Sequence, residues 1–185
     1  PTPNLGNLLV PFSDEENGPT ARAQALVFTP DGQTIITGAN DGSIIRWDVN
    51  TGELLQSYTE ADVEEPAMIW DVAMMPDGGS FITADGDGRL RQWDIESGEI
   101  LQIFDEHSSA ALGVDINADG TQMLSSANDR SVRLWDIETG AVIHIMQGHG
   151  GAIRGVEFSP VGPYAVTGGD DTVVIQAHDE DGVQV

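Results

Sequence analysis

Short runs of β-branched and aromatic residues alternate with turn residues along this chain. In one stretch the runs are Ala25–Thr29, Thr34–Thr37, Ser43–Trp47 and Glu53–Tyr58, separated by Pro-Asp-Gly, Asn-Asp-Gly and Thr-Gly. Runs of this length bounded by such turns are typical of β-hairpins, and four in succession predict an antiparallel meander. No segment has the 3.6-residue period of an amphipathic helix. The pattern predicts an all-β protein.

The four-strand pattern recurs. The stretch Thr37–Asp48 returns as Thr83–Asp94 and again as Ser125–Asp136, so the repeats are spaced 46 and 42 residues apart. A fourth unit is degenerate, because Ala177 and His178 stand at its Trp-Asp positions. Periods of roughly 20–50 residues indicate supersecondary units that stack on their neighbours.

Trp-Asp at the end of the third strand, Gly148-His149 before a first strand and this period together resemble the WD-repeat β-propellers. The resemblance covers residues 4–185 and implies blades of four antiparallel strands. On this alignment the chain divides into an orphan fourth strand over 1–12, a polar linker over 13–20, and blades over 21–59, 60–104, 105–147 and 148–185, the last one truncated.

The chain has about four blades, whereas propellers of the family it resembles have seven or eight. Three arrangements of the ring are therefore compatible with the sequence. The chain is part of a larger propeller, or two chains close an eight-bladed ring, or the first strand completes a four-bladed ring. Propellers of four to eight blades are known, so all three remain hypotheses. An open end would expose apolar blade faces and favour self-association.

The resemblance also implies a hydrogen-bonded tetrad of His, Ser or Thr, Asp and Trp inside a blade. Only the third blade has all four residues, His107, Ser125, Asp129 and Trp135. The partial sets are Thr37, Asp41 and Trp47; Thr83, Asp87 and Trp93; and His149, Thr167 and Asp171. Because a complete buried polar network rigidifies its surroundings, we expect slowest hydrogen exchange in the third blade and fastest in the fourth.

In such propellers the first strand of each blade lines the central channel. By alignment, the residues at its start are Gln24, Trp70, Leu112 and Arg154, on the face that carries the turns before the first and third strands. Trp and Arg are typical of interaction hot spots, which makes these four positions the predicted binding residues. The alternative for Trp70 is that it packs beneath the inserted loop Glu60–Pro66.

Charge narrows the range of partners. The chain has 31 acidic residues against seven basic ones, all of them Arg, for a net charge of −24. Such a surface repels nucleic acids and anionic membranes and suits cationic partners. No apolar run reaches the length of a membrane-spanning helix. The absence of Cys and Lys leans towards an extracytoplasmic or salt-rich setting, although the compartment stays unknown.

Catalytic and metal-binding readings have little support in the sequence. Asp115 and Glu157 are the best carboxylate pair for a hydrolase, and the turn Asp85-Gly-Asp87 lacks the other ligands of a calcium loop. We therefore expect no enzyme activity, cofactor or metal. The favoured function is a non-catalytic scaffold that binds a protein or peptide; the alternatives are a structural subunit that completes a propeller and a hydrolase.

Overall fold

The computed structural model describes residues 22–59, 66–162, 164–171 and 173–177. Within these ranges the chain forms fifteen β-strands and no helix, which confirms the all-β prediction. The predicted orphan strand over 1–12, the linker over 13–20 and the inserted loop up to Glu65 lie outside the described residues.

The strands form four separate antiparallel sheets. The first sheet contains β1 (Ala23–Phe28), β2 (Thr34–Ala39), β3 (Ile44–Asp48) and β4 (Leu54–Tyr58). The second contains β5 (Ile69–Met74), β6 (Ser80–Asp85), β7 (Leu90–Asp94) and β8 (Ile100–Phe104). The third contains β9 (Ala111–Ile116), β10 (Gln122–Ala127), β11 (Ser131–Asp136) and β12 (Val142–Gln147). The fourth contains β13 (Ile153–Phe158), β14 (Tyr164–Gly169) and β15 (Val173–Ala177).

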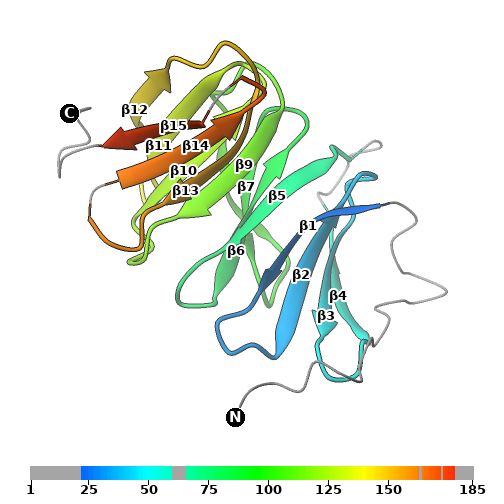
Figure 1. The fold of residues 1–185 in the computed structure, drawn as a ribbon. Helices are drawn as coiled ribbons and strands as arrows, with labels where there is room; N and C mark the ends of the chain where they lie inside the picture. The colour runs from blue at the N-terminus through cyan, green and yellow to red at the C-terminus, as the bar shows by residue number, and fades with distance from the viewer. Residues whose placement is uncertain (1–21, 60–65, 163, 172, 178–185) are drawn as a thin grey trace, which may run out of the picture.

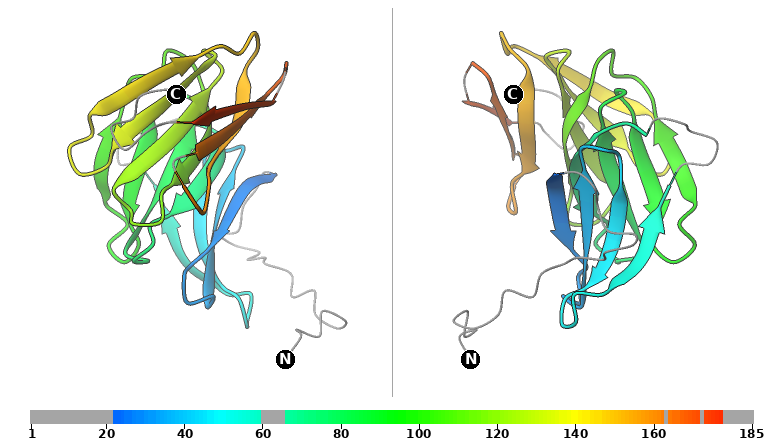
Figure 2. Two further views of the ribbon diagram at one scale, coloured as in Figure 1. Left: turned by 60° about the vertical axis from the view of Figure 1, so that its left-hand side comes forward. Right: turned by 90° about the vertical axis from the view of Figure 1, so that its right-hand side faces the viewer.

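Each sheet is a meander whose strands pair in chain order, and each sheet is one blade. The first strands β1, β5, β9 and β13 contact one another in succession and lie side by side in Figure 1. The outermost strands β4, β8 and β12 are sheet edges. Two further views show the four sheets arranged one after another in chain order (Figure 2). This arrangement is that of β-propeller blades, as predicted.

The turns between the second and third strands need a left-handed backbone residue. Gly42 and Gly88 provide it in the first two blades, with φ of 81° and 91°. The equivalent residue in the third blade is Arg130, at φ 67°. An L-residue with a Cβ adopts this conformation at some cost, so the tight turn itself, rather than glycine, is the common feature of the blades.

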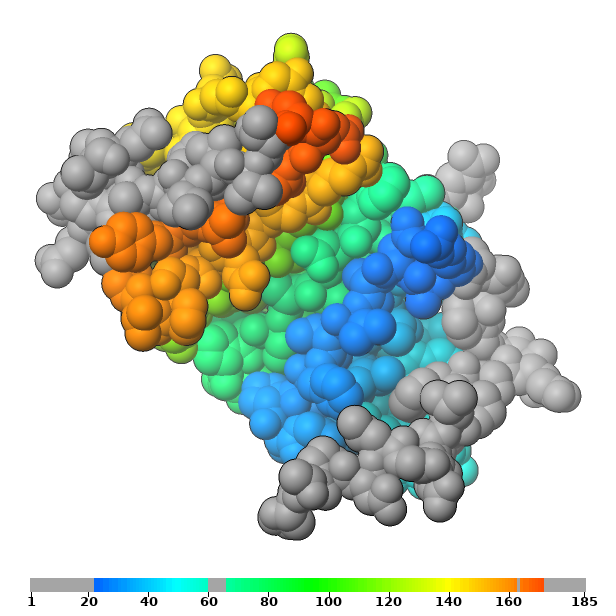
Figure 3. Space-filling model, in the orientation of Figure 1, coloured from blue at the N-terminus to red at the C-terminus, as the bar shows by residue number. Residues whose placement is uncertain are grey.

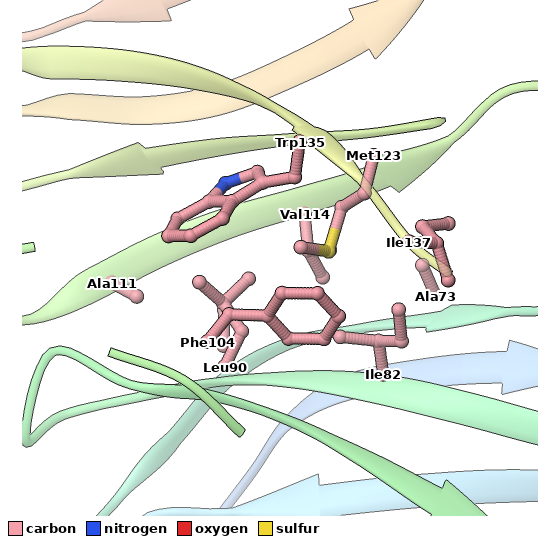
Figure 4. Packing of buried hydrophobic residues seen from close by; sticks show 10 residues of the cluster. Ala73, Ile82, Leu90, Phe104, Ala111, Val114, Met123, Trp135 and Ile137 are labelled. Atoms are coloured by element: carbon pink, nitrogen blue, oxygen red, sulfur yellow. The ribbon is translucent and has the colours of Figure 1, made fainter. Parts of the chain in front are cut away.

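Most of the hydrophobic core lies between blades, although a smaller cluster of Ile35, Ile45 and Trp47 lies within the first blade. Between the second and third blades, Phe104 and Ile82 pack against Met123, Val114 and Trp135 (Figure 4). Similar clusters join the first blade to the second and the third to the fourth. Because one face of each sheet must be buried against its neighbour, the repeat is stable only as a stack.

Candidate functional site

The four predicted binding residues share one structural feature, which is that each is the extra residue of a β-bulge. In the first blade Ala23 pairs with Ala39 and Ala25 with Gly38, so Gln24 is left without a partner in the register. The other three bulged residues are Trp70, Leu112 and Arg154. A bulge takes its residue out of the strand's regular alternation and re-aims the side chain, and bulges are frequent next to functional sites.

The four bulged residues differ in exposure. Arg154 is exposed, whereas Gln24 and Trp70 are partly buried. Leu112 retains only 8% of its accessible surface, so it is a core residue that offers almost no surface to a partner. The predicted set of four is thus reduced to three residues with accessible surface.

Arg154 is tied to the neighbouring turn by a two-point ion pair. Its Nε lies 2.5 Å from Asp170 Oδ1 and its Nη2 3.1 Å from Asp170 Oδ2. The Arg154 guanidinium lowers the pKa of Asp170, which therefore stays ionised at neutral pH. This ion pair holds the Arg154 side chain against the turn that follows β14. The turn lies on the face at which the inner strands start, where the predicted binding residues are found.

In the third blade the structure brings together all four predicted tetrad residues. Trp135 Nε1 donates to Ser125 Oγ at 2.8 Å, and His107 Nε2 lies 2.7 Å from the same hydroxyl. His107 Nδ1 lies 2.9 Å from Asp129 Oδ2. A carboxylate only accepts, so Nδ1 carries the proton and a neutral imidazole accepts the Ser125 hydroxyl at Nε2. Burial lowers the pKa of His107, which agrees with a neutral ring.

Asp129 gives this network a pH dependence. Burial opposes its ionisation, but hydrogen bonds from Ser131 and His107 outweigh burial and lower the pKa of Asp129 from 3.8 to about 2. We expect Asp129→Asn to cost about 1.5–3 kcal/mol at pH 7, since it removes a charged acceptor. A depressed pKa stabilises the fold above pH 4 and ceases to do so as pH falls towards 2.

The free energy of unfolding of wild type and Asp129→Asn, measured by urea titration between pH 7 and 2, tests this expectation. The difference between the two proteins should shrink below pH 4. A difference that stays constant down to pH 2 would show that the ionisation of Asp129 contributes nothing.

The first and fourth blades have parts of the same network. Trp47 Nε1 donates to Thr37 Oγ1 at 2.8 Å, and Asp41 accepts from the Ser43 hydroxyl at 2.7 Å. In the fourth blade, the ring nitrogens of His149 lie 2.7 Å from Asp171 and 2.8 Å from Thr167. Each partial set therefore forms the bonds for which it has the residues.

In the second blade a buried Arg takes the place of the His. Trp93 Nε1 still donates to Thr83 Oγ1 at 3.1 Å. Arg91 Nη2 lies 2.8 Å from Asp87 Oδ2, and Arg91 Nη1 forms an ion pair with Asp85. Arg91 and Asp85 are buried, and the second oxygen of Asp85, Oδ1, has no hydrogen-bond partner among the described residues. Burial raises the pKa of Asp85 to about 6, although Arg91 opposes that shift.

Sequence reasoning missed this ion pair, although a signal for it exists. Asp85 stands where the first and third blades have Ala39 and Ala127, and the tetrad His is replaced by Glu65 in the same blade. A charged residue at a position that is otherwise small indicates a partner nearby, because an unpaired buried charge is costly.

Carboxylates on the inner strands link neighbouring blades. Asp71 Oδ2 accepts from the backbone N–H of Val114 at 3.1 Å, and Asp115 Oδ2 accepts from that of Phe158 at 2.6 Å. Burial raises the pKa of both carboxyl groups, and the nearby charge of Glu157 adds to the rise at Asp115. Asp115, one of the two carboxylates considered for a hydrolase, thus links the fourth blade to the third, while its counterpart Glu157 is exposed.

Among the described residues no three His, Asp or Glu side chains are grouped so that they could hold a metal ion. The turn Asp85-Gly-Asp87 instead directs both of its carboxylates to Arg91. In the ranges described, no helix is long and apolar enough to span a membrane.

Comparison with protein families agrees with the blade geometry. The family described as WD domain, G-beta repeat matches residues 16–48, 52–94, 98–136 and 140–175. The chain therefore belongs to the WD-repeat family, as the resemblance implied. From the second one on, each matched repeat starts two residues before the outermost strand of one sheet and ends on the third strand of the next sheet. Each of these repeats therefore spans two neighbouring sheets.

Two solved structures share this fold closely. The structure described as RRP9 WD40 repeats is 26% identical to this chain, with a TM-score of 0.82. The structure of U3-55K is also 26% identical, with a TM-score of 0.81. Both alignments cover 91% of this chain but 52% of the other chain, so this chain spans about half the length of these relatives. No curated protein sequence matches it significantly.

Proposed function

We propose that this protein is a non-catalytic interaction scaffold that binds a protein or peptide on the face marked by the bulged residues. The observation that carries the proposal is the bulge at one equivalent position in all four inner strands. Figure 3 shows β1 (blue) beside β5 (green) on one side of the molecule, and each inner strand contacts the next one in the series.

Trp70 and Arg154 are the contact residues on this face. Trp70 is the only Trp outside the repeating column of the third strands, and it is partly exposed. An aromatic ring, and a guanidinium held in place by an ion pair, offer contact area to a partner and lose little side-chain conformational entropy on binding. Both are typical of hot spots. The acidic turns around them, which include Asp41 and Asp170, favour a partner with basic residues next to its anchoring side chain.

Substitution of the two contact residues tests the proposal. Peptides selected from a displayed library on the wild-type protein should bind Trp70→Ala and Arg154→Ala about tenfold or more weakly. Both side chains lie at least partly outside the core, so the melting temperature should change little. The control is Ile145→Thr on the outermost strand β12, which should keep wild-type affinity. Undiminished binding by both test variants would contradict the proposal.

A second candidate function is that of a structural subunit that completes a propeller, and the exposure of the end blades favours it. Leu26 on β1 is 65% exposed, whereas the equivalent Val72 and Val114 are 6% and 5% exposed, because a preceding blade covers them. At the other end, Val166 on β14 is exposed where the equivalent Leu124 is fully buried. In a ring closed by a second chain, the exposed face of the first blade would pack against the exposed face of a fourth blade, and both would be buried.

Light scattering tests the second candidate. High salt screens the net charge of −24, so a mass of twice 19.7 kDa in high salt would support closure of a ring by two chains. Leu26→Asp should then return the protein to 19.7 kDa. A wild type that stays at 19.7 kDa at all salt concentrations would reject closure by a second copy.

A further inference from the structure

The outermost strand of the second blade, β8, combines three features that its counterparts lack together. It is an edge strand that pairs only with β7 among the described strands. It carries two exposed aliphatic side chains, since Leu101 is 55% and Ile103 is 44% exposed. It contains no charged residue, but carboxylates stand at both of its ends.

The open edge of β8 is a template for another strand. An edge strand leaves a row of backbone N–H and C=O groups unpaired, and proteins usually protect such an edge with charges inside the strand or with proline. β8 has neither; its sequence is Ile-Leu-Gln-Ile-Phe. Within the described part of the chain its protection is a bulge at Leu101, which leaves Gln102, Ile103 and Phe104 in regular pairing with β7. An extended segment could therefore add to this edge.

The charges at the two ends of β8 determine which kind of strand would pair with its open edge. Glu99 directly precedes β8, and Asp105 and Glu106 directly follow it; all three are exposed. Asp105 is bound by Arg89 at 3.1 Å, whereas Glu99 and Glu106 form no ion pair with any described residue. A second copy aligned on β8 in either direction would place carboxylates against carboxylates, which disfavours self-pairing. A segment with basic residues at both ends would instead be attracted.

We propose that β8 is a docking site for an extended segment of another protein, with aliphatic residues at alternate positions between two basic residues. Backbone hydrogen bonds to the β8 edge would supply affinity, and apolar contacts with Leu101 and Ile103 would set the register. Glu99 and Glu106 would select basic ends. This site lies on the outer edge of the second blade and is independent of the face with the bulged residues.

The outer strand of the third blade provides a matched control within the same molecule. β12 also has two exposed aliphatic residues, Ile143 and Ile145, and an open edge. Its neighbours in the chain are Ala141 and Gly148 rather than carboxylates. If apolar edge character alone sufficed, β12 and β8 would bind alike. If the flanking carboxylates matter, only β8 binds.

The experiment uses two synthetic peptides in which Val and Thr alternate, one with Lys and one with Glu at both ends. We expect the Lys peptide to bind the protein at least about tenfold more tightly at low salt, and the preference to fade at high salt. Leu101→Thr/Ile103→Thr and Glu99→Gln/Glu106→Gln should each weaken that binding about tenfold, while Ile143→Thr/Ile145→Thr should not. Hydrogen exchange should slow in residues 100–104 when the Lys peptide is bound.

Several outcomes would overturn the docking site on β8. They are failure of the Lys peptide to bind, equal binding of the Glu peptide, an equal loss with the β12 variant, and no loss with the β8 variants. Light scattering adds a further test: a doubled mass abolished by Leu101→Thr/Ile103→Thr would show that a second copy, not another protein, occupies the edge. Variants at Trp70 and Arg154 should leave Lys-peptide binding unchanged, so the two binding proposals fail or stand separately.

Discussion

Replacement of Arg91 by Met should destabilise the protein by about 3–5 kcal/mol at pH 7, because it leaves a buried carboxylate without its cation. Arg91 forms ion pairs with both Asp85 and Asp87, and Asp85 is almost fully buried. The pKa of Asp85 is already raised to about 6 by burial. Loss of the guanidinium would raise that pKa further, so the folded variant would bind a proton that the unfolded chain does not.

The pH dependence identifies this mechanism. A carboxyl group whose folded-state pKa lies above its unfolded value favours folding as pH falls through the folded value. The loss in Arg91→Met should therefore shrink between pH 7 and 5, as measured by urea unfolding. Adding Asp85→Asn to Arg91→Met should recover part of the stability at pH 7, since the uncompensated charge is then gone.

Arg89 is the matched control for Arg91. It lies two residues away in the same blade and contacts Asp105 at 3.1 Å and Asp87 at 3.5 Å, but its side chain is 42% exposed, against 5% for that of Arg91. Exposed ion pairs contribute about 0–1 kcal/mol, so Arg89→Met should have little effect at any pH. Equal losses in the two variants, or a loss in Arg91→Met that does not depend on pH, would contradict a role for burial.

Truncation of Trp135 to Ala should also cost about 3–5 kcal/mol, because its ring fills the seam between two blades. Trp135 is fully buried, and its ring meets Phe104 of the second blade edge-on, with centroids 5.5 Å apart (Figure 4). Its indole N–H also donates to Ser125, so the substitution removes packing and a buried hydrogen bond together.

Two further variants separate these contributions to the stability of the third blade. Trp135→Phe keeps an aromatic ring but loses the donor, and should cost less than Trp135→Ala. Trp70→Ala removes the same side chain from a partly exposed position and should cost far less. Thermal unfolding followed by circular dichroism measures all three. A Trp135→Ala variant as stable as Trp70→Ala would show that the seam between the second and third blades does not depend on this ring.

Contacts within a blade could be predicted from the sequence because the hairpin turns determine the register. Asp-Gly turns and β-branched runs place Trp135 opposite Met123 and Ser125 near the indole, and the same offsets recur in the other blades. Register in a hairpin follows from turn type and length, so a repeated local pattern yields a repeated local geometry. The tetrad bonds and the equivalent positions of the bulged residues both follow from this rule.

Contacts between blades were decided only by the tertiary structure. Leu112 occupies a predicted binding position yet is buried, and Asp71 reaches Val114 across 43 residues of chain. The ion pair between Arg91 and Asp85 is buried, and the repeat pattern alone does not identify these two side chains as partners. The repeat period determines that the blades stack. The packing of one sheet on the next determines which side chains are buried, and therefore which ones remain accessible to a partner.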